Sequence, residues 1–487
     1  MIRLPVRIPA VAHVLGQFLM MMSVAMLIPL GFALVGEADS PVPVLTGFLA
    51  ALTIGALLAR IFPRPQSGIG DREALLTVVA VWVSVALLGS IPFYVSPYFH
   101  SFTDAFFEAA SGFTTTGASI LTDVEVLPDS LQFWRHFSHW LGGMGIIMLG
   151  IAILPLIGIG GTKLYNAQFA GAPSERIKPR VLETAHALWR VYIGITLAEY
   201  TALRLAGMSS FDAICHTFST LGTGGFSNRT ASIAYYDNAA IEAILILFMI
   251  VSSLNFAAQY KMWVERHPGS FLRDIEVRFH LAVIALATAG ATLTLVLHSG
   301  YPLLSSIRQA AFQVTSIGTT TGFVTADYEK WHPFAQLTLL ALMYLGGNTS
   351  STAGGFKSFR VVLMLRVVAR ATVLLVQPRR VMPVRIGKSV IPDPALFSLL
   401  NLVVLAIGWN FAASLLLAAS GLDLLTSLTA VPACMFSVGP AFGLVGPVEN
   451  YAGLPDFAKW VLSATMLVGR VEFYTALVVF TRAFWRL

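Results

Sequence analysis

The sequence predicts an all-α integral membrane protein with ten transmembrane spans, arranged as two N-terminal spans followed by four pseudo-repeats. Of its 487 residues, 56% are hydrophobic and only 11% are charged, whereas soluble domains carry about 25% charged residues. Apolar runs of about 20 residues, long enough to cross the hydrocarbon core of a membrane, recur along the chain. A short serine-to-glycine pattern also recurs four times between these runs, and a repeat of this size indicates the architecture.

The ten expected spans lie, in chain order, at residues 10–35, 43–62, 74–95, 132–157, 185–206, 239–260, 278–298, 334–374, 394–419 and 457–483. The eighth is too long for one straight span and contains YLGGNTSSTAGGFKSF, so we expect a broken helix there. The expected units are the two first spans over 1–70 and four repeats over 71–165, 166–265, 266–375 and 376–487.

One set of loops is rich in Lys and Arg, including those at 60–72, 163–180, 261–278 and 379–388. Basic loops stay on the cytoplasmic side of the membrane, so we expect both termini to be cytoplasmic. The opposite loops are acidic, which favours cations at the mouth of a pathway. The charge pattern does not suggest a nucleic-acid partner. Cys215 and Cys434 are the only cysteines and lie in apolar settings, so no disulfide framework or metal site is expected.

Four outward segments share a serine and a glycine six residues later: SGFTTTG at 111–117, STLGTGG at 219–225, SIGTTTG at 316–322 and SVGPAFG at 437–443. Each follows a half-apolar run that is too short to span a membrane and is predicted to form a half-helix. Asp104, Asp212 and Asp423 are expected in the first turns, where a carboxylate suits the helix dipole. The inward C-terminal ends would carry partial negative charge and stabilise a cation.

After each half-helix the chain has to return in an extended form, which glycine permits and which exposes backbone carbonyls. This arrangement resembles the TrkH/TrkG/KtrB superfamily of potassium transporters, whose single chain carries four repeats of helix, pore helix, filter and helix around one central pore. Carbonyl oxygens of potassium-channel filters replace the hydration shell of the ion. The resemblance implies a K⁺-binding filter formed by Thr115, Thr116, Gly117, Thr223, Gly224, Gly225, Thr320, Thr321, Gly322, Ala441, Phe442 and Gly443. Because the fourth copy keeps only the glycine, we expect fewer well-formed sites than in a symmetric channel.

The middle of the broken helix is too polar and too rich in glycine to face lipid, so it must be buried in protein or line water. The resemblance implies an intramembrane loop that obstructs the pore from the cytoplasmic side. The residues of this candidate gate are Gly346, Gly347, Asn348, Thr349, Ser350, Ser351, Thr352, Ala353, Gly354, Gly355 and Lys357. Lys357 either adds repulsion to the barrier or reaches the cytoplasmic interface, and we favour the interface.

Arg470 lies within the apolar final span, where a cation is costly unless it faces a partner or a wet cavity. The resemblance implies that it projects into the permeation path below the filter and forms a barrier to K⁺. The alternative is a structural pair with Glu472. By the same cost argument Glu199 is notable, but it has no clear partner and is interpreted as structural. His136 and His139 are expected at the membrane interface rather than in a metal site.

The predicted function is K⁺ uptake across the bacterial cytoplasmic (inner) membrane, with K⁺ as the transported ion and no cofactor. Na⁺- or H⁺-coupled symport through the same pore is the alternative. A membrane-embedded enzyme is disfavoured because the chain has no nucleophile and base, or metal cluster, at suitable spacing. The two N-terminal spans are similar to the ten-span Trk branch, which implies a homodimer in membrane lipid and a cytoplasmic TrkA-like nucleotide-binding regulatory protein.

Overall fold

The structure is a computed structural model that describes residues 6–36, 39–65, 69–152, 181–264, 266, 268–386 and 389–485. Within these ranges the chain is almost entirely helical. A two-stranded antiparallel pair, β1 (Arg385–Ile386) and β2 (Ser389–Val390), lies between two long helices. The expected basic loop at 163–180 and the expected repeat boundary at 165/166 lie outside the described residues.

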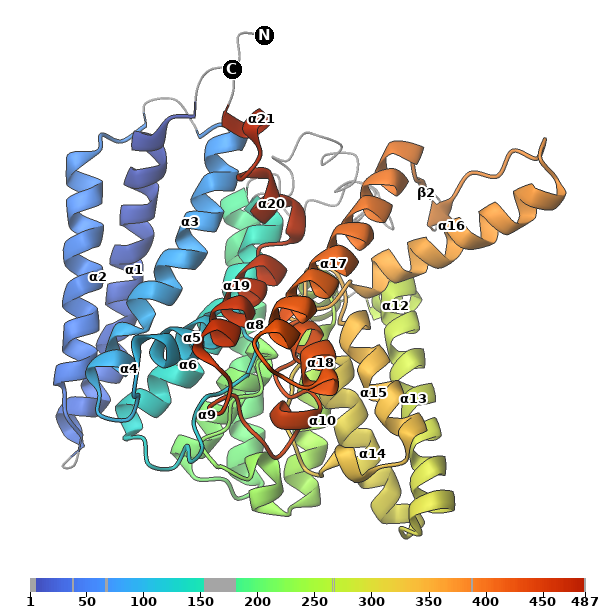
Figure 1. Cartoon of the computed structure of the whole chain (residues 1–487), viewed down its shortest axis with the longest axis horizontal. Helices are drawn as coiled ribbons and strands as arrows, with labels where there is room; N and C mark the ends of the chain where they lie inside the picture. The colour runs from blue at the N-terminus through green and yellow to red at the C-terminus, as the bar shows by residue number, and fades with distance from the viewer. Residues whose placement is uncertain are drawn as a thin grey trace.

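The first four helices occupy one side of the molecule in Figure 1: α1 (Ile8–Val35), α2 (Val42–Ile61), α3 (Asp71–Gly89) and the short α4 (Ile91–Val95). The backbones of α1 and α2 touch at Gly16 and Gly55. A Cβ atom on Gly16 would lie 2.7 Å from the carbonyl oxygen of Gly55. Small residues at such a crossing are typical of membrane helices, which pack through close backbone contact.

The next two groups are α5 (Phe102–Phe113) with α6 (Asp129–Ala152), and α8 (Val181–Leu205), α9 (Ser210–Gly222), η1 (Ser232–Tyr236), α10 (Ala239–Ser253) and α11 (Phe256–Trp263). They are followed by α12 (Pro268–Arg273), α13 (Ile275–Ser299), α14 (Leu303–Gly318), η2 (Tyr328–Lys330), α15 (Pro333–Leu345) and α16 (Ser358–Val376). The last group is α17 (Asp393–Ala419), α18 (Leu424–Met435), η3 (Gly443–Val445), α19 (Asp456–Arg470), α20 (Phe473–Val478) and α21 (Arg482–Trp485).

Five stretches of the described chain are long and apolar enough to cross a membrane: α1, α2, α3 with α4, α13 and α17. The bent pair α10 and α11 makes a sixth if it is counted as one span. These helices support an integral membrane protein. Helices of the interior need not be apolar all round, and α6 buries Arg135, His136 and His139.

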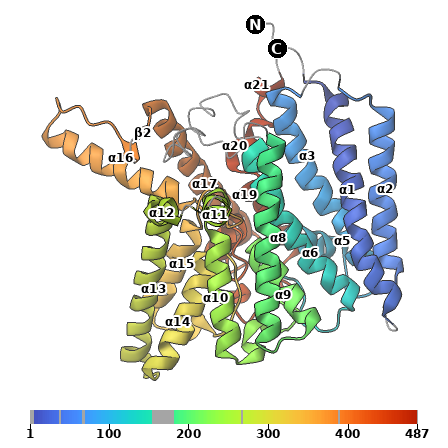
Figure 2. The same ribbon diagram turned by 180° about the vertical axis from the view of Figure 1, so that it is seen from behind.

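The expected spans at 239–260 and 457–483 each contain a break between two helices in the structure. The axis turns by 106° between α10 and α11, and Figure 2 shows α11 almost end-on. The side chain of Asn255 caps α11 by accepting the N–H groups of Ala257 and Ala258. In the final span, α19 ends at Arg470, and α20 begins after Glu472, whose φ of 64° is left-handed. A break was expected only in the eighth span, so these two breaks are additional to it.

The described chain begins and ends at the same end of the molecule, where α21 lies near the start of α3 (Figure 1). Val479 and Phe484 pack there against Leu75 and Val6. Helix α16 extends sideways from the body of the molecule, and the residues that precede α17 return along it (Figures 1 and 2). The largest hydrophobic core is built around α5, α6, α14, α15, α18 and α19.

Candidate functional site

Four helices end in the interior and are too short to span a membrane. α5, α9, α14 and α18 have 12, 13, 16 and 12 residues, and a crossing needs about 20. The hydroxyls of Ser101 and Ser209 and the carboxylate of Asp423 cap three of them by accepting an N–H group three residues later. Asp104 and Asp212 lie in first turns as predicted, whereas Asp423 is the N-cap residue itself.

Each half-helix is followed by the same backbone turn. A hydroxyl residue with positive φ comes first and a glycine with positive φ follows two positions later: Thr115 and Gly117, Thr223 and Gly225, Thr320 and Gly322, Ser437 and Gly439. The residue between them donates its N–H over 2.8 Å to a carbonyl five residues earlier, in the pairs Thr116 to Ser111, Gly224 to Ser219, Thr321 to Ser316 and Val438 to Ala433. Left-handed threonine and serine are strained, and such strain concentrates at functional sites.

The four turns contact one another in a closed ring. A Cβ atom on Gly117 would lie 1.9 Å from the carbonyl oxygen of Gly224, and one on Gly225 would lie 2.0 Å from that of Thr321. The same relation joins Gly322 to the carbonyl oxygen of Val438 at 2.0 Å, and Gly439 to that of Thr116 at 2.7 Å. We call these four turns the glycine ring. No side chain fits at its tightest contacts, which explains the glycines physically.

The fourth predicted segment is in the wrong register. Ala441, Phe442 and Gly443 lie in the loop after the ring, and Gly443 begins η3. The carbonyl of Ala441 accepts the Tyr328 hydroxyl at 3.1 Å, and the carbonyl of Phe442 accepts that of Thr429 at 3.1 Å. These carbonyls are therefore engaged in holding the loop, and Gly439 occupies the position that was assigned to Gly443.

The error came from the residue used to align the segments. Ala433 stands where the other segments have Ser111, Ser219 and Ser316, so the serine-to-glycine pattern matched Ser437 instead. The shorter pattern of a hydroxyl residue, any residue and glycine is shared by all four and would have found Gly439. Ser437 also supplies the hydroxyl residue of the fourth turn, whereas the fourth segment of the sequence-based alignment contained only the glycine of the expected pattern.

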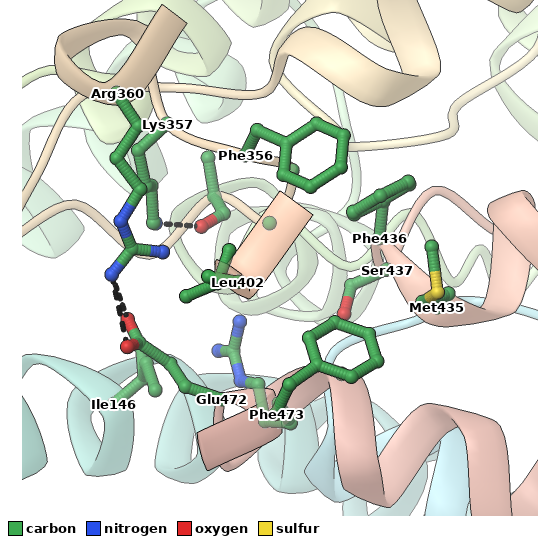
Figure 3. A pocket seen from close by; sticks show the side chains of 15 residues that line it. Ile146, Phe356, Lys357, Arg360, Leu402, Met435, Phe436, Ser437, Glu472 and Phe473 are labelled. Carbon is green, nitrogen blue, oxygen red and sulfur yellow. Dashed lines mark hydrogen bonds and ion pairs between the residues drawn. The ribbon is translucent and has the colours of Figure 1, made fainter. Parts of the chain in front are cut away.

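A cavity lies at each end of the glycine ring. One, of about 130 Å³, is lined by all four ring glycines and by the residues that follow them, including Glu449 and Asn450. The other, of about 50 Å³, is lined by Ser437, by residues 353–357 and by Arg470 and Glu472 (Figure 3). Both are large enough to hold water. The ring therefore separates the two cavities. Following the predicted orientation of the chain, we call the first the outer cavity and the second the inner cavity.

The loop between α15 and α16, residues 346–357, lies directly against the inner side of the ring. The N–H of Gly354 donates to the Thr320 hydroxyl over 2.7 Å. A Cβ atom on Gly354 would lie 1.9 Å from the carbonyl oxygen of Phe436, which immediately precedes Ser437. The loop thus touches two of the four turns through backbone atoms.

The other side of the loop is attached to neighbouring helices. Thr349 donates its N–H and its hydroxyl to the two carboxylate oxygens of Glu276, over 2.9 and 2.8 Å. The N–H of Asn348 donates to the Ser253 carbonyl over 2.8 Å, and the N–H of Phe256 donates to the Ser350 carbonyl over 3.1 Å. The break between α10 and α11 therefore exposes backbone groups that the loop satisfies, which accounts for both interruptions together.

Arg470 reaches both the loop and α6. It is 3% exposed, and its guanidinium donates to the carbonyls of Thr352 over 2.9 Å and Gly142 over 3.2 Å. Glu472 accepts instead from Arg360, at 2.9 Å to each carboxylate oxygen. The alternative of an Arg470 pair with Glu472 is therefore wrong. Because the chain turns sharply at Glu472, the two side chains point to different partners.

Lys357 lines the inner cavity rather than reaching the membrane interface. Its ammonium donates to the Ala353 carbonyl within the same loop (Figure 3). The expected interfacial position is therefore wrong, and Lys357 adds a cation to a cavity that Arg360 and Arg470 also line. With Glu472 as the acidic residue of that lining, the cavity wall carries more positive than negative side chains.

His136 and His139 are fully buried beside the second turn of the ring, so their predicted interfacial position is also wrong. Both imidazoles contact the Ser219 hydroxyl, at 2.8 and 3.2 Å. Nearby, Arg135 and Glu108 form a buried ion pair, and Arg135 also donates to the Ser227 carbonyl over 2.9 Å. Across the described residues, no group of three possible metal ligands is found.

The chain is similar to several known proteins over nearly its whole length. Residues 43–486 match the TrkH family, described as "Cation transport protein". The Trk system potassium uptake protein TrkH of Halomonas elongata is 37% identical, covering 98% of this chain and 99% of that protein. TrkG of Escherichia coli K12, also named a Trk system potassium uptake protein, is 33% identical over 98% of each chain. The crystal structure of the potassium transporter TrkH from Vibrio parahaemolyticus is similar with a TM-score of 0.91 and 36% identity, covering 99% of this chain and 100% of that one.

Proposed function

This chain belongs to the TrkH family of cation transport proteins, and we propose that it takes up K⁺ across the bacterial cytoplasmic (inner) membrane through the glycine ring. Its relatives are membrane transport proteins, and so this chain is a transport protein rather than an enzyme. The observation that carries the proposal is the closed ring of four left-handed turns between two cavities. The potassium uptake named for the relatives supports K⁺ as the ion.

The proposed filter consists of the three residues of each turn. These are Thr115, Thr116, Gly117, Thr223, Gly224, Gly225, Thr320, Thr321, Gly322, and Ser437, Val438, Gly439 in place of Ala441, Phe442 and Gly443. Backbone carbonyls in such a ring replace the hydration shell of K⁺. The C-terminal ends of four half-helices meet there, and their partial negative charge favours a cation.

The same proposal includes the finer architecture. Ten spans, with four repeats around one pore and basic loops inside, would place both termini in the cytoplasm. The start of α1 and α21 lie at the same end of the molecule, which supports two termini on one side (Figure 1). The inner cavity and loop 346–357 would then face the cytoplasm. By family resemblance we also include a homodimer and a cytoplasmic TrkA-like nucleotide-binding regulatory protein. Na⁺- or H⁺-coupled symport is the alternative transport mode.

Flux into liposomes tests the proposed function directly. Purified protein should pass K⁺ and Rb⁺ in preference to Na⁺, because carbonyl cages favour the larger, more easily dehydrated ions. Repeating K⁺ uptake with and without a Na⁺ or pH gradient separates passive flux from symport, since only symport requires the gradient. Equal passage of Na⁺ and K⁺ by folded protein would contradict the proposal.

Loop 346–357 is the proposed gate, and its removal should increase flux. Deleting residues 349–352 removes the contacts of the loop with Glu276, Phe256 and Arg470 but leaves the glycine ring intact. The expected result is faster K⁺ flux with an unchanged K⁺ to Na⁺ ratio, because selection occurs in the ring. Deletion of the exposed residues 378–381, after α16, is the length-matched control and should change neither quantity. A folded loop deletion with wild-type flux would exclude the gate.

A further inference from the structure

The glycine ring is uneven at one position. Between the hydroxyl residue and the glycine, three turns carry a side chain, at Thr116, Thr321 and Val438, whereas the second turn has Gly224. Gly224 is not among the residues with positive φ, so its backbone would accept an ordinary side chain. Backbone conformation therefore does not explain this glycine.

The imidazole of His139 occupies the space that a side chain at Gly224 would fill. A Cβ atom on Gly224 would lie 2.4 to 2.6 Å from three atoms of that imidazole, much closer than packed atoms approach. His139 comes from α6, is 0% exposed, and stacks on Phe226 with ring centroids 4.1 Å apart and an interplanar angle of 15°. Its Nδ1 lies 3.2 Å from the Ser219 hydroxyl.

The surroundings hold this imidazole rigidly. The guanidinium of Arg135 lies 3.6 Å from the centroid of the same Phe226 ring and is paired with Glu108 at 2.5 Å. Phe226 directly follows Gly225, so the stack of His139 on Phe226 is continuous with the second turn. A glycine without such support is the most mobile kind of residue in a chain. The Gly224 carbonyl, which contacts Gly117, therefore depends on a side chain from another helix.

We propose that His139 is a positioning residue that determines ion selectivity. Its imidazole gives the second turn the packing that the side chains of Thr116, Thr321 and Val438 give the other three. The inference rests on the proposed K⁺ selection by the glycine ring. His139 does not contact the ion in this account, and acts only by restricting the Gly224 carbonyl.

The test is the K⁺ to Na⁺ flux ratio of single variants in liposomes. His139→Ala should lower the ratio about tenfold, equal to about 1.4 kcal/mol. His139→Phe keeps the ring volume and should stay within about twofold of wild type, as volume-conserving changes are tolerated best. His136→Ala is the matched control, since His136 is equally buried and contacts the same Ser219 hydroxyl, whereas the atoms nearest to Gly224 all belong to His139. It should keep the wild-type ratio.

A double variant separates packing from a general loss of structure. Gly224→Ala alone should lower the ratio because of the clash with the imidazole. Combining Gly224→Thr with His139→Ala rebuilds the arrangement of the other turns and should restore the ratio, even if His139→Ala alone folds poorly. A wild-type ratio in folded His139→Ala, an equal loss in His139→Phe, or no recovery in the double variant would each overturn the proposal. Absence of K⁺ preference in the wild-type protein would instead overturn the proposed function.

Discussion

Gly322→Ala is expected to remove most of the preference for K⁺ over Na⁺. The new Cβ atom would lie 2.0 Å from the Val438 carbonyl oxygen and 3.0 Å from Cδ of Pro440. The φ of 86° at this position adds strain for any residue with a side chain. Because both neighbours are constrained backbone or proline atoms, the third and fourth turns have to separate. This separation changes the carbonyl geometry that selects the ion in the proposed filter. The K⁺ to Na⁺ flux ratio in liposomes measures the effect.

Gly443→Ala is the matched control for this prediction. Gly443 also has a left-handed φ, 78°, and a crowded Cβ position, 2.4 Å from the Thr426 hydroxyl. The clash there is with a side chain outside the ring, so this variant should lose thermal stability and keep its ion preference. The opposite pattern, with preference lost at Gly443 and retained at Gly322, would show that the sequence-based register was right and that the geometric one is wrong.

Arg470→Ala is expected to increase K⁺ flux at least about tenfold. Two positive charges about 6 Å apart repel each other by about 3 kcal/mol at an effective dielectric constant of 20, which exceeds the 1.4 kcal/mol of a tenfold change. The substitution also releases Thr352 of the loop, whose carbonyl now accepts from the guanidinium. Because Arg470 has no ion-pair partner among the described residues, its removal strands no buried acid. Flux per folded protein and a melting curve measure the two consequences separately.

Arg470→Lys distinguishes charge from tethering. Lysine keeps the positive charge but cannot donate simultaneously to the Thr352 and Gly142 carbonyls in the geometry of a guanidinium. Flux should stay low if the charge is the barrier, and should rise toward that of Arg470→Ala if the tether to the loop is what matters. A large loss of thermal stability in Arg470→Ala with no gain in flux would contradict the pore-facing assignment in either form.

Composition and local pattern were sufficient for the class of protein. Apolar runs and glycine-rich polar segments led to a helical membrane protein similar to potassium transporters, and the family match over residues 43–486 confirms that resemblance. The polar stretch between Leu345 and Ser358 could be recognised because its residues cannot satisfy their backbone groups in lipid. These features depend on neighbouring residues in the chain, so the sequence itself determined them.

Contacts between distant segments were decided only by the tertiary structure. The contact of Gly439 with the Thr116 carbonyl joins residues more than 300 positions apart, and the partner of Glu472 is Arg360 on another helix. The burial of His139 and the bend between α10 and α11 likewise arise from packing and from hydrogen bonds with the loop. A side chain's partner depends on which backbone groups remain unsatisfied nearby once the helices have packed, and no local pattern in the chain contains that information.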